Sequence, residues 1–400
     1  MKRFCTLPLF YLLVFSAFSQ SHPFKCLTPH HPKLELPKDF TKYQLGEKSA
    51  VKLQAVVHVI YHDSDNDLPD AVVEEMIKKV NEDFRRQNPD TVDTPNAFRP
   101  FAADTNIEFE LATVDPTGGP TNGITHTQTP HEFFEAFELG QVQFDSTGGH
   151  SAWDPLKYVN IWLVRNTFHL GIALSPFSHG QPRDGVIVSC FYFDFERQVT
   201  HELGHYLGLY HPFNYDVPFP SPTDTCSNAP GGPDGLEDTP NQLNVTYSVG
   251  PCPDFPYTDL CSPDTPGVMF MNYMDFSPAA CKNMFTHQQA AAMNWVLDSI
   301  RFSLFEQVTS TDNFAVDEKF EAAVFPNPVR DKLYVEFQNL TNAVTEYQLF
   351  DGMGKIKAMG QLESRINFDH ELNIAHLPKG IYLLKIKSGS KIGVRKIIKL

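Results

Sequence analysis

The hydrophobic pattern of residues 50–300 predicts alternating strands and helices. Apolar runs predict strands at 55–61, 158–164 and 186–192, and strict alternation predicts another at 107–111. After Pro69, apolar residues recur at helical spacing, at Val73, Met76, Ile77, Val80 and Phe84. The order strand, helix, strand, strand, strand leads into a helix near residue 200. We therefore expect a mixed α/β domain.

A second helix is predicted after a long stretch without periodicity. The hydrophobic periodicity is lost beyond His211 for some sixty residues, up to Met274. It returns at Thr286 and Gln289, which form a capping-box pattern ahead of the apolar residues Met293, Val296, Leu297 and Ile300. This helix is expected to serve core packing rather than chemistry.

The pattern changes again near residue 320. Short alternating segments at 333–337, 347–350 and 381–386, separated by glycine-containing turns, predict a small all-β sandwich over residues 321–400. These residues contain twelve Lys and Arg against eight Asp and Glu, whereas the whole chain has a net charge of −16. We place the larger domain at 50–302 and a linker at 303–320. The acidic balance argues against a nucleic-acid partner, because phosphates require a basic face.

The N-terminus has the features of an export signal. Lys2 and Arg3 precede an apolar stretch from Leu7 to Phe18, and Ala17-Phe18-Ser19 has the form of a signal-peptidase site. We predict a signal peptide at 1–19, a candidate propeptide at 20–49, and a secreted or cell-surface protein. The apolar stretch is shorter than the roughly 20 residues of a spanning helix, so no transmembrane anchor is expected.

Six cysteines follow the signal, and four of them fall between residues 226 and 281. In an exported protein this clustering indicates disulfides that stabilise a loop without a core of its own. A zinc ribbon is the alternative. It is disfavoured because the spacings contain no Cys-x-x-Cys pair.

The stretch Thr200-His201-Glu202-Leu203-Gly204-His205 carries the strongest chemical signal. Residues four apart on a helix share a face, so His201 and His205 can direct two nitrogens at one metal ion. Gly208 can leave the helix by a left-handed turn that brings His211 back as a third ligand. Three protein ligands with an open position are typical of catalytic zinc, and Glu202 is the predicted general base and acid. A structural zinc, the alternative, has no use for that carboxylate.

This extended motif resembles that of the metzincin metalloproteases. Met271-Asn272-Tyr273-Met274-Asp275-Phe276 matches their methionine turn, with Met274 as the turn methionine, and Asn272–Asp275 followed by Cys281 and Met284-Phe285-Thr286 resembles the pappalysin (cytophagalysin-like) branch. Segments 81–88, 104–109 and 238–240 resemble the same branch. The resemblance implies a mixed twisted sheet with an active-site helix and endopeptidase activity on protein or peptide substrates. It covers about residues 50–300.

The resemblance also implies disulfides and a second metal ion. At one position the chain departs from the pattern of the family. By position it pairs Cys226 with Cys261 and Cys252 with Cys281. It suggests a structural calcium ion near Asp234 and Asp238, although acids in such a loop are as often simply solvated. Where the family usually has a tyrosine that steadies the oxyanion, this chain has Phe276, so that contribution is lost or comes from elsewhere.

Cys26 and Cys190 are left, and two interpretations stay open. The two cysteines can pair with each other. Alternatively, the Cys26 thiolate occupies the open zinc position until a propeptide is removed, as in some metzincin zymogens. The second, latency, interpretation is slightly favoured.

The C-terminal segment has a resemblance of its own. Phe325-Pro326-Asn327-Pro328, Leu377-Pro378-Lys379-Gly380 and the basic end from Arg395 resemble the type IX secretion sorting domain of Bacteroidetes. The resemblance implies that the type IX machinery is a partner in outer-membrane export. A carbohydrate- or protein-binding sandwich is the alternative.

The predicted function is therefore zinc-dependent endopeptidase activity outside the cell. Two alternatives differ in class. A catalytically weak or inactive zinc-containing binding protein is supported by Phe276 and opposed by the intact Glu202. A zinc hydrolase acting on small amides or esters would cleave no protein.

Overall fold

A computed structural model describes most of the chain. It covers residues 25–26, 34, 36–37, 40–43, 50–134, 140–165, 169–190, 195–213, 226, 233–243, 245–246, 251–306, 322–326, 329–337, 345–351, 355–362, 370–388 and 391–400. The predicted signal peptide lies outside these residues. No helix in the described part is long and apolar enough to cross a membrane.

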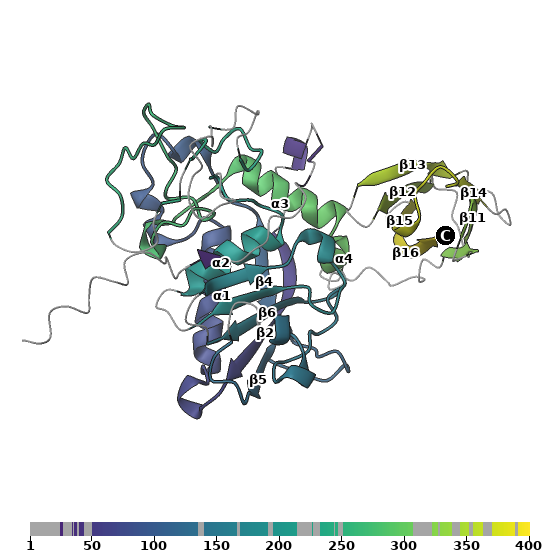
Figure 1. Cartoon of the computed structure of the whole chain (residues 1–400), viewed down its shortest axis with the longest axis horizontal. Helices are drawn as coiled ribbons and strands as arrows, with labels where there is room; N and C mark the ends of the chain where they lie inside the picture. Colours follow the sequence, from purple (N-terminus) through teal and green to yellow (C-terminus); the bar gives the residue numbers. More distant parts are fainter. Residues whose placement is uncertain are drawn as a thin grey trace, which may run out of the picture.

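The first body of the molecule is built on a seven-stranded sheet (Figure 1). Its strand order is β1 (Lys25–Cys26), β7 (His169–Ala173), β8 (Val186–Ser189), β6 (Val159–Val164), β2 (Val51–Tyr61) and β4 (Ile107–Leu111), with β5 (Ile124–Gln128) also pairing with β2. The strands β4, β5, β2, β6 and β8 run parallel, whereas β7 is antiparallel to β8. The sheet is thus mixed, as predicted, and the antiparallel strand lies near its edge.

The central strands are apolar on both sides because both faces of the sheet are covered. Leu53, Ala55 and Val57 of β2 pack against helices, whereas Ile60 packs with Trp162 on the opposite face. Strands that are buried on both faces have continuous apolar runs in their sequences, which is the pattern found at 55–61 and 158–164.

Three helices pack into the main core. These are α1 (Asp70–Phe84), α2 (Phe195–Tyr206) and α3 (His287–Ser299), followed by the short α4 (Phe302–Glu306). The predicted apolar stripe of α1 is buried, and α3 begins with the predicted capping box between Thr286 and Gln289. The two-stranded sheet of β3 (Ala102–Ala103) and β9 (Phe285–Thr286) precedes α3.

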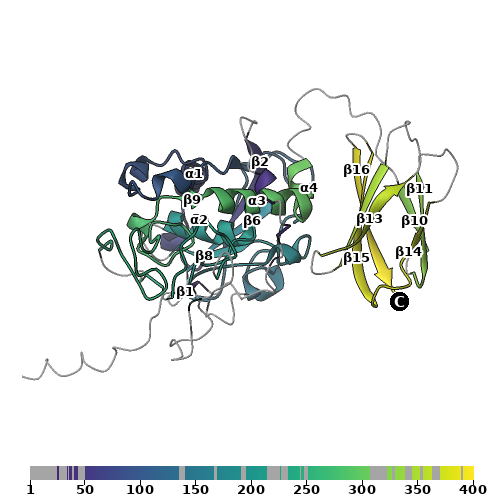
Figure 2. The ribbon, with the colours of Figure 1, turned by 90° about the horizontal axis from the view of Figure 1, so that it is seen from above.

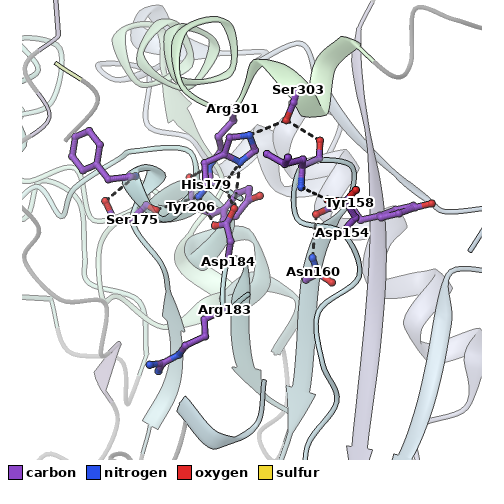
Figure 3. Close-up of polar contacts among 12 residues, drawn as sticks. Asp154, Tyr158, Asn160, Ser175, His179, Arg183, Asp184, Tyr206, Arg301 and Ser303 are labelled. Atoms are coloured by element: carbon purple, nitrogen blue, oxygen red, sulfur yellow. Dashed lines mark hydrogen bonds and ion pairs between the residues drawn. The ribbon is translucent and has the colours of Figure 1, made fainter. Parts of the chain in front are cut away.

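A buried ion pair fastens the junction of α3 and α4 to the body of the domain (Figure 3). Arg301 and Asp184 are both 0% exposed, and the guanidinium contacts the two carboxylate oxygens at 2.7 and 2.9 Å. The Arg301 Nε also donates to the Tyr206 carbonyl at the end of α2. The charge of Arg301 and its hydrogen bonds outweigh burial, so the pKa of Asp184 lies below its ordinary value.

The C-terminal strands form a second body, a two-sheet sandwich (Figure 2). One sheet has the order β10 (Ala322–Phe325), β11 (Lys332–Phe337), β14 (His370–Asn373), and the other has β13 (Ile356–Leu362), β12 (Thr345–Asp351), β15 (Gly380–Ser388), β16 (Lys391–Lys399). Leu333 and Val335 from one sheet and Leu349 and Leu384 from the other belong to one buried cluster. The sandwich therefore has a core separate from that of the first body, as the alternation predicts.

Candidate metal centre

Three imidazoles converge between α2 and the loop that follows it. His201 and His205 lie one helical turn apart, and Gly208, with φ +92°, takes the left-handed conformation that turns the chain back. The Nε2 atoms of His201, His205 and His211 lie 2.9 to 3.3 Å from one another. All three side chains are at most 9% exposed.

Backbone acceptors fix the tautomers of two of these rings. His201 Nδ1 lies 2.7 Å from the Tyr273 carbonyl, and His205 Nδ1 lies 2.8 Å from the Leu209 carbonyl. A carbonyl oxygen can only accept, so the proton of each ring is on Nδ1 and the lone pair is on Nε2. Burial, with the charges of His205 and Lys282, lowers the pKa of His201 well below its ordinary value, which keeps the ring neutral.

This donor set fits a zinc ion. Nitrogen lone pairs that face each other in a buried space repel unless a cation lies between them, and neutral imidazole nitrogens are good zinc ligands. Among the described residues, the one group of at least three His, Cys, Asp or Glu side chains close enough to share a metal ion is Cys26, His201, His205 and His211, with ligand atoms within 4.8 Å of one another. The predicted ligands are thus brought together.

Glu202 lies beside this cluster and is fully buried. Gln198 Nε2, one turn earlier on α2, donates to Glu202 Oε1 at 2.7 Å. A Cβ on Gly171 of β7 would approach that oxygen to 2.6 Å, so the carboxylate fits against the backbone of the strand. The close packing at Gly171 and the bond from Gln198 hold the carboxylate in place.

The methionine turn lies directly under the helix. A Cβ on Gly204 would approach the Met274 sulfur to 2.5 Å, which places Met274 against the turn of α2 between His201 and His205. The Asn272 side chain accepts from the Met274 amide and exchanges two hydrogen bonds with Gln289 of α3. The helix predicted to serve only packing therefore also holds this turn.

Phe276 occupies the place where the resemblance expects a tyrosine. Its ring centroid lies 4.7 Å from that of His211, 5.0 Å from that of Phe213 and 5.7 Å from that of His201. The side chain therefore packs against the imidazoles but offers no hydroxyl.

Cys26 enters the site from the first strand. Its thiol donates to Glu202 Oε2 over 3.5 Å, and β1, the outermost strand at this end of the sheet, runs parallel to β7. Cys26 and Cys190 form no disulfide with each other. The predicted disulfides Cys226–Cys261 and Cys252–Cys281 are both present. The zinc-ribbon alternative is therefore wrong for these four cysteines.

Calcium binding by Asp234 and Asp238 stays a prediction. Asp238 accepts from the Thr286 hydroxyl and the Gln288 amide, and Asp234 accepts from the Leu236 amide and the Thr239 hydroxyl. These contacts account for much of the hydrogen-bonding capacity of both carboxylates.

A network behind the histidines was not found from the sequence. Asp83 of α1, 3% exposed, accepts from the Tyr273 hydroxyl at 2.9 Å and from the Thr200 hydroxyl at 2.7 Å, and it pairs with Arg197 at 2.9 Å. Arg197 also contacts both carboxylate oxygens of Asp90. The sequence feature that could have indicated this network is the acidic residue at position 83, next to the apolar stripe of α1.

A Ser303–His179–Asp184 chain has the residue types of a hydrolytic triad, but its partners make it structural (Figure 3). His179 lies 2.9 Å from Ser303 Oγ and 3.3 Å from Asp184. The Ser303 hydroxyl donates to the Leu156 carbonyl, and Arg301 contacts both Asp184 oxygens. The serine proton and the aspartate charge are therefore already engaged in holding α4.

Comparisons with protein families match both bodies. Residues 144–298 match the family model described as pregnancy-associated plasma protein-A, a peptidase family, and residues 323–400 match the secretion system C-terminal sorting domain. The match to the sorting domain identifies a secreted or cell-surface protein, as predicted.

Individual relatives agree with these matches. Extracellular metalloproteases of the fungi Verticillium alfalfae and Colletotrichum graminicola are 38% and 34% identical over 26% and 30% of this chain. The aligned segment spans about a third of each fungal protein, 32% and 39%.

The solved structures match over a longer stretch. Mature mirolysin of Tannerella forsythia, solved with a cleaved peptide, is 38% identical with a TM-score of 0.60, and the match covers 66% of this chain and 99% of that one. A mutant promirolysin of the same organism is 36% identical with a TM-score of 0.60, over 69% of this chain and 91% of that one.

Proposed function

This chain belongs to the pappalysin family of zinc metalloproteases, and we propose that it is a zinc-dependent endopeptidase that acts outside the cell. The observation that carries the proposal is the convergence of the His201, His205 and His211 Nε2 atoms within 3.3 Å of one another, with the Glu202 carboxylate beside them. The mirolysin structure that holds a cleaved peptide supports a peptide substrate.

In this proposal the three histidines hold the zinc ion and Glu202 moves the proton. When bound, zinc supplies Lewis acidity, which lowers the pKa of a water molecule and polarises the peptide carbonyl. Glu202 Oε2 accepts the proton of the attacking water and then delivers it to the nitrogen of the leaving amine. Gln198 holds Oε1, so the other oxygen keeps its direction during both transfers.

We also propose that Cys26 keeps the precursor latent. Its sulfur lies among the ligand atoms of the three histidines, and its strand β1 pairs with β7. Without β1, the strand β7 would be the edge of the sheet, and a substrate would add there, because an exposed strand offers its unpaired backbone groups to an extended peptide. Removal of the segment that carries Cys26 then frees both the metal position and the strand edge.

The C-terminal sandwich is proposed to engage the type IX secretion machinery. The sorting-domain match at 323–400 supports this, and the separate core of the sandwich allows it to fold as a unit of its own.

The test uses protein from which the propeptide and tail have been removed, and it compares the parent with two variants. Zinc content is measured together with digestion of a denatured protein mixture. We expect about one zinc per chain and cleavage in the parent, and retained zinc with loss of cleavage in Glu202→Ala. Glu196→Ala is the matched control, because this glutamate lies on the same helix and pairs with Lys79 outside the site.

The competing function is a zinc-containing binding protein, which Phe276 favours because it lacks the hydroxyl. Bound zinc without Glu202-dependent cleavage would establish that function and overturn the protease. Turnover of small amides or esters without cleavage of protein would instead indicate a non-proteolytic hydrolase.

A further inference from the structure

His211, the third predicted ligand, is held in place by aromatic side chains. The other two predicted ligands project from α2, whereas His211 follows the left-handed turn at Gly208. Its ring stacks on that of Phe213, with centroids 4.7 Å apart and planes inclined by 10°, and the Phe276 ring meets it edge-on at 4.7 Å. These two rings therefore set the plane of the one predicted ligand that the helix does not carry.

The segment that follows His211 is tied to a second loop by Gln242. The Gln242 amide donates to the Pro212 carbonyl over 3.3 Å, and Phe213 forms a parallel β-bridge with Gln242. The Gln242 side chain is 2% exposed, and its Nε2 donates to Asp275 Oδ1 over 3.2 Å. Gln242 therefore connects the chain that carries His211 to the methionine turn.

Asp275 joins both supports of His211 through one oxygen atom. The side chain is fully buried. Its Oδ1 accepts from the Phe276 amide at 2.7 Å, from the Gln242 side chain at 3.2 Å and from the Thr246 amide at 3.4 Å. The same oxygen thus holds the residue whose ring packs against His211 and the loop that pairs with the chain after His211.

The methionine turn also orients His201, at the other side of the metal site. The Tyr273 carbonyl, two residues before Asp275, binds His201 Nδ1, and the turn is fixed on α3 through Asn272. His201 and His211 are ten positions apart, α2 ends between them, and their Nε2 atoms are separated by 3.3 Å. One turn therefore sets the spacing of the first and third ligands.

We propose that Asp275 is a positioning residue that orients His211 for the metal ion, and that it acts as a hydrogen-bond acceptor rather than as a charge. The inference rests on the proposed zinc-dependent function. A ligand that is already oriented loses less conformational freedom when it binds, so loss of this support should weaken metal binding.

An asparagine at position 275 can separate the acceptor from the charge. The amide oxygen of asparagine can accept the same hydrogen bonds as Oδ1. The second carboxylate oxygen, Oδ2, accepts no hydrogen bond from the described part of the chain, so an amide nitrogen in its place displaces no donor. Alanine, in contrast, removes the acceptor altogether.

The experiment measures the zinc dissociation constant by chelator competition. It uses the full-length chain with Cys26→Ala, so that the thiolate does not compete for the metal ion. We expect Asp275→Ala to raise the constant at least about tenfold, as for other outer partners of metal ligands. The visible absorption of the cobalt(II)-substituted protein should shift as well, because it reports the ligand geometry. Asp275→Asn should stay within about threefold of the parent, because the acceptor remains.

Two further variants separate the positioning of His211 from a general loss of stability. Gln242→Leu removes the donor to Asp275 and keeps the backbone bridge, so the zinc dissociation constant should rise about fivefold, the value of one hydrogen bond. Asn160→Ala is the matched control. It removes a buried side chain that bonds Trp153 and His58, and it should leave the zinc constant within about twofold, as expected for an independent position.

Zinc binding by Asp275→Ala that is as tight as in the parent overturns the proposal. Equal weakening in Asp275→Asn also overturns it, because the charge would then be what matters. If thermal unfolding shows that Asp275→Ala does not fold, Gln242→Leu decides, and an unchanged constant there rejects the proposal. None of these measurements needs proteolysis. Loss of Glu202-dependent cleavage would therefore reject the peptidase alone, whereas a parent that binds no zinc would reject both.

Discussion

At the residue scale, His201 is oriented by contacts that begin far away in the sequence. Its Nδ1 is bound by the Tyr273 carbonyl, and the Tyr273 hydroxyl donates to Asp83 on α1. Burial raises the pKa of Asp83 to about 6, while Arg197, Thr200 and Tyr273 act in the opposite direction. The carboxylate is therefore ionised at pH 7 and accepts from its neighbours. Such outer partners hold metal ligands in position.

We predict that Asp83→Asn weakens both folding and metal binding. The amide removes one of the two carboxylates that pair with the partly exposed Arg197, and Asp90 remains as the other, so the free energy of unfolding should fall by about 1.5 kcal/mol. Zinc affinity should fall about tenfold, as for other partners of metal ligands. Denaturant unfolding and chelator competition measure the two effects. Asp104→Asn, at an exposed carboxylate, is the control, and equal effects of both substitutions would contradict the prediction.

A second prediction concerns Gly171, which the Glu202 carboxylate contacts. In Gly171→Ala the new Cβ would approach Glu202 Oε1 to 2.6 Å and Cγ to 2.7 Å, so the carboxylate must move. A displacement of this size should reduce kcat about 100-fold while zinc stays bound. Steady-state kinetics with zinc analysis tests this. Full activity would mean that Glu202 has room to adjust.

At the element scale, α2 carries both chemistry and packing on different faces. Val199, Leu203 and Tyr206 belong to the main core, whereas His201 and His205 face the site and Glu202 contacts Cys26 there. The end of α2 is tied by Arg301 to Asp184 in the loop between β7 and β8. The helix α2, which presents the histidines, and the loop after β7 are thus joined through one buried ion pair.

Asp184 should make stability depend on acid pH. Its folded-state pKa lies below the unfolded value, so the carboxylate stabilises the fold above the unfolded pKa of about 3.9 and loses this contribution as the pH falls through the folded pKa. We predict that Asp184→Asn costs about 3 to 5 kcal/mol at pH 7, because Arg301 is left buried without its partner.

Urea unfolding of parent and variant between pH 7 and pH 3 measures this contribution. The difference between the two free energies should shrink toward the acid end. A constant difference would show that Asp184 does not titrate in this range.

At the whole-molecule scale, the first strand β1, its neighbour β7 and the histidine helix α2 meet at the site, as expected for the latent precursor that we propose. Residues 26, 171 and 202 come together although they are separated by up to 176 positions. We predict that the Cys26→Ala precursor hydrolyses protein at a rate at least about tenfold above the uncut parent, because the open metal position is no longer covered. Activity assays on the two unprocessed precursors test this prediction. Equal activity of the two precursors would reject latency by Cys26.

The two separate cores allow a prediction about the tail. Because the buried clusters of the first body and of the sandwich share no residues, removal of residues 321–400 should leave zinc binding and peptidase activity within about twofold. The same truncation should stop export. Activity assays on the purified protein test the first expectation, and cell fractionation tests the second. Loss of activity would show that the sandwich supports the catalytic body.

The sequence alone determined what depends on neighbours along the chain. The spacing of His201, His205 and Gly208, the apolar stripe of α1 and the capping box at Thr286 follow from helix geometry, and β2 and β6 follow from long apolar runs. The resemblance added the disulfides and the turn methionine. Shorter strands such as β5 and β7 were missed, because five-residue segments with polar members carry little periodic signal.

Only the tertiary structure decided which distant polar groups meet. Asp83 contacts Tyr273 across 190 positions, and Gln289 of α3 holds Asn272. Neither of these pairs has a spacing that a helix or strand repeats, so no local pattern could reveal them. Their positions follow from how the helices pack on the sheet and how the disulfide-linked segment folds back, which is a property of the whole chain.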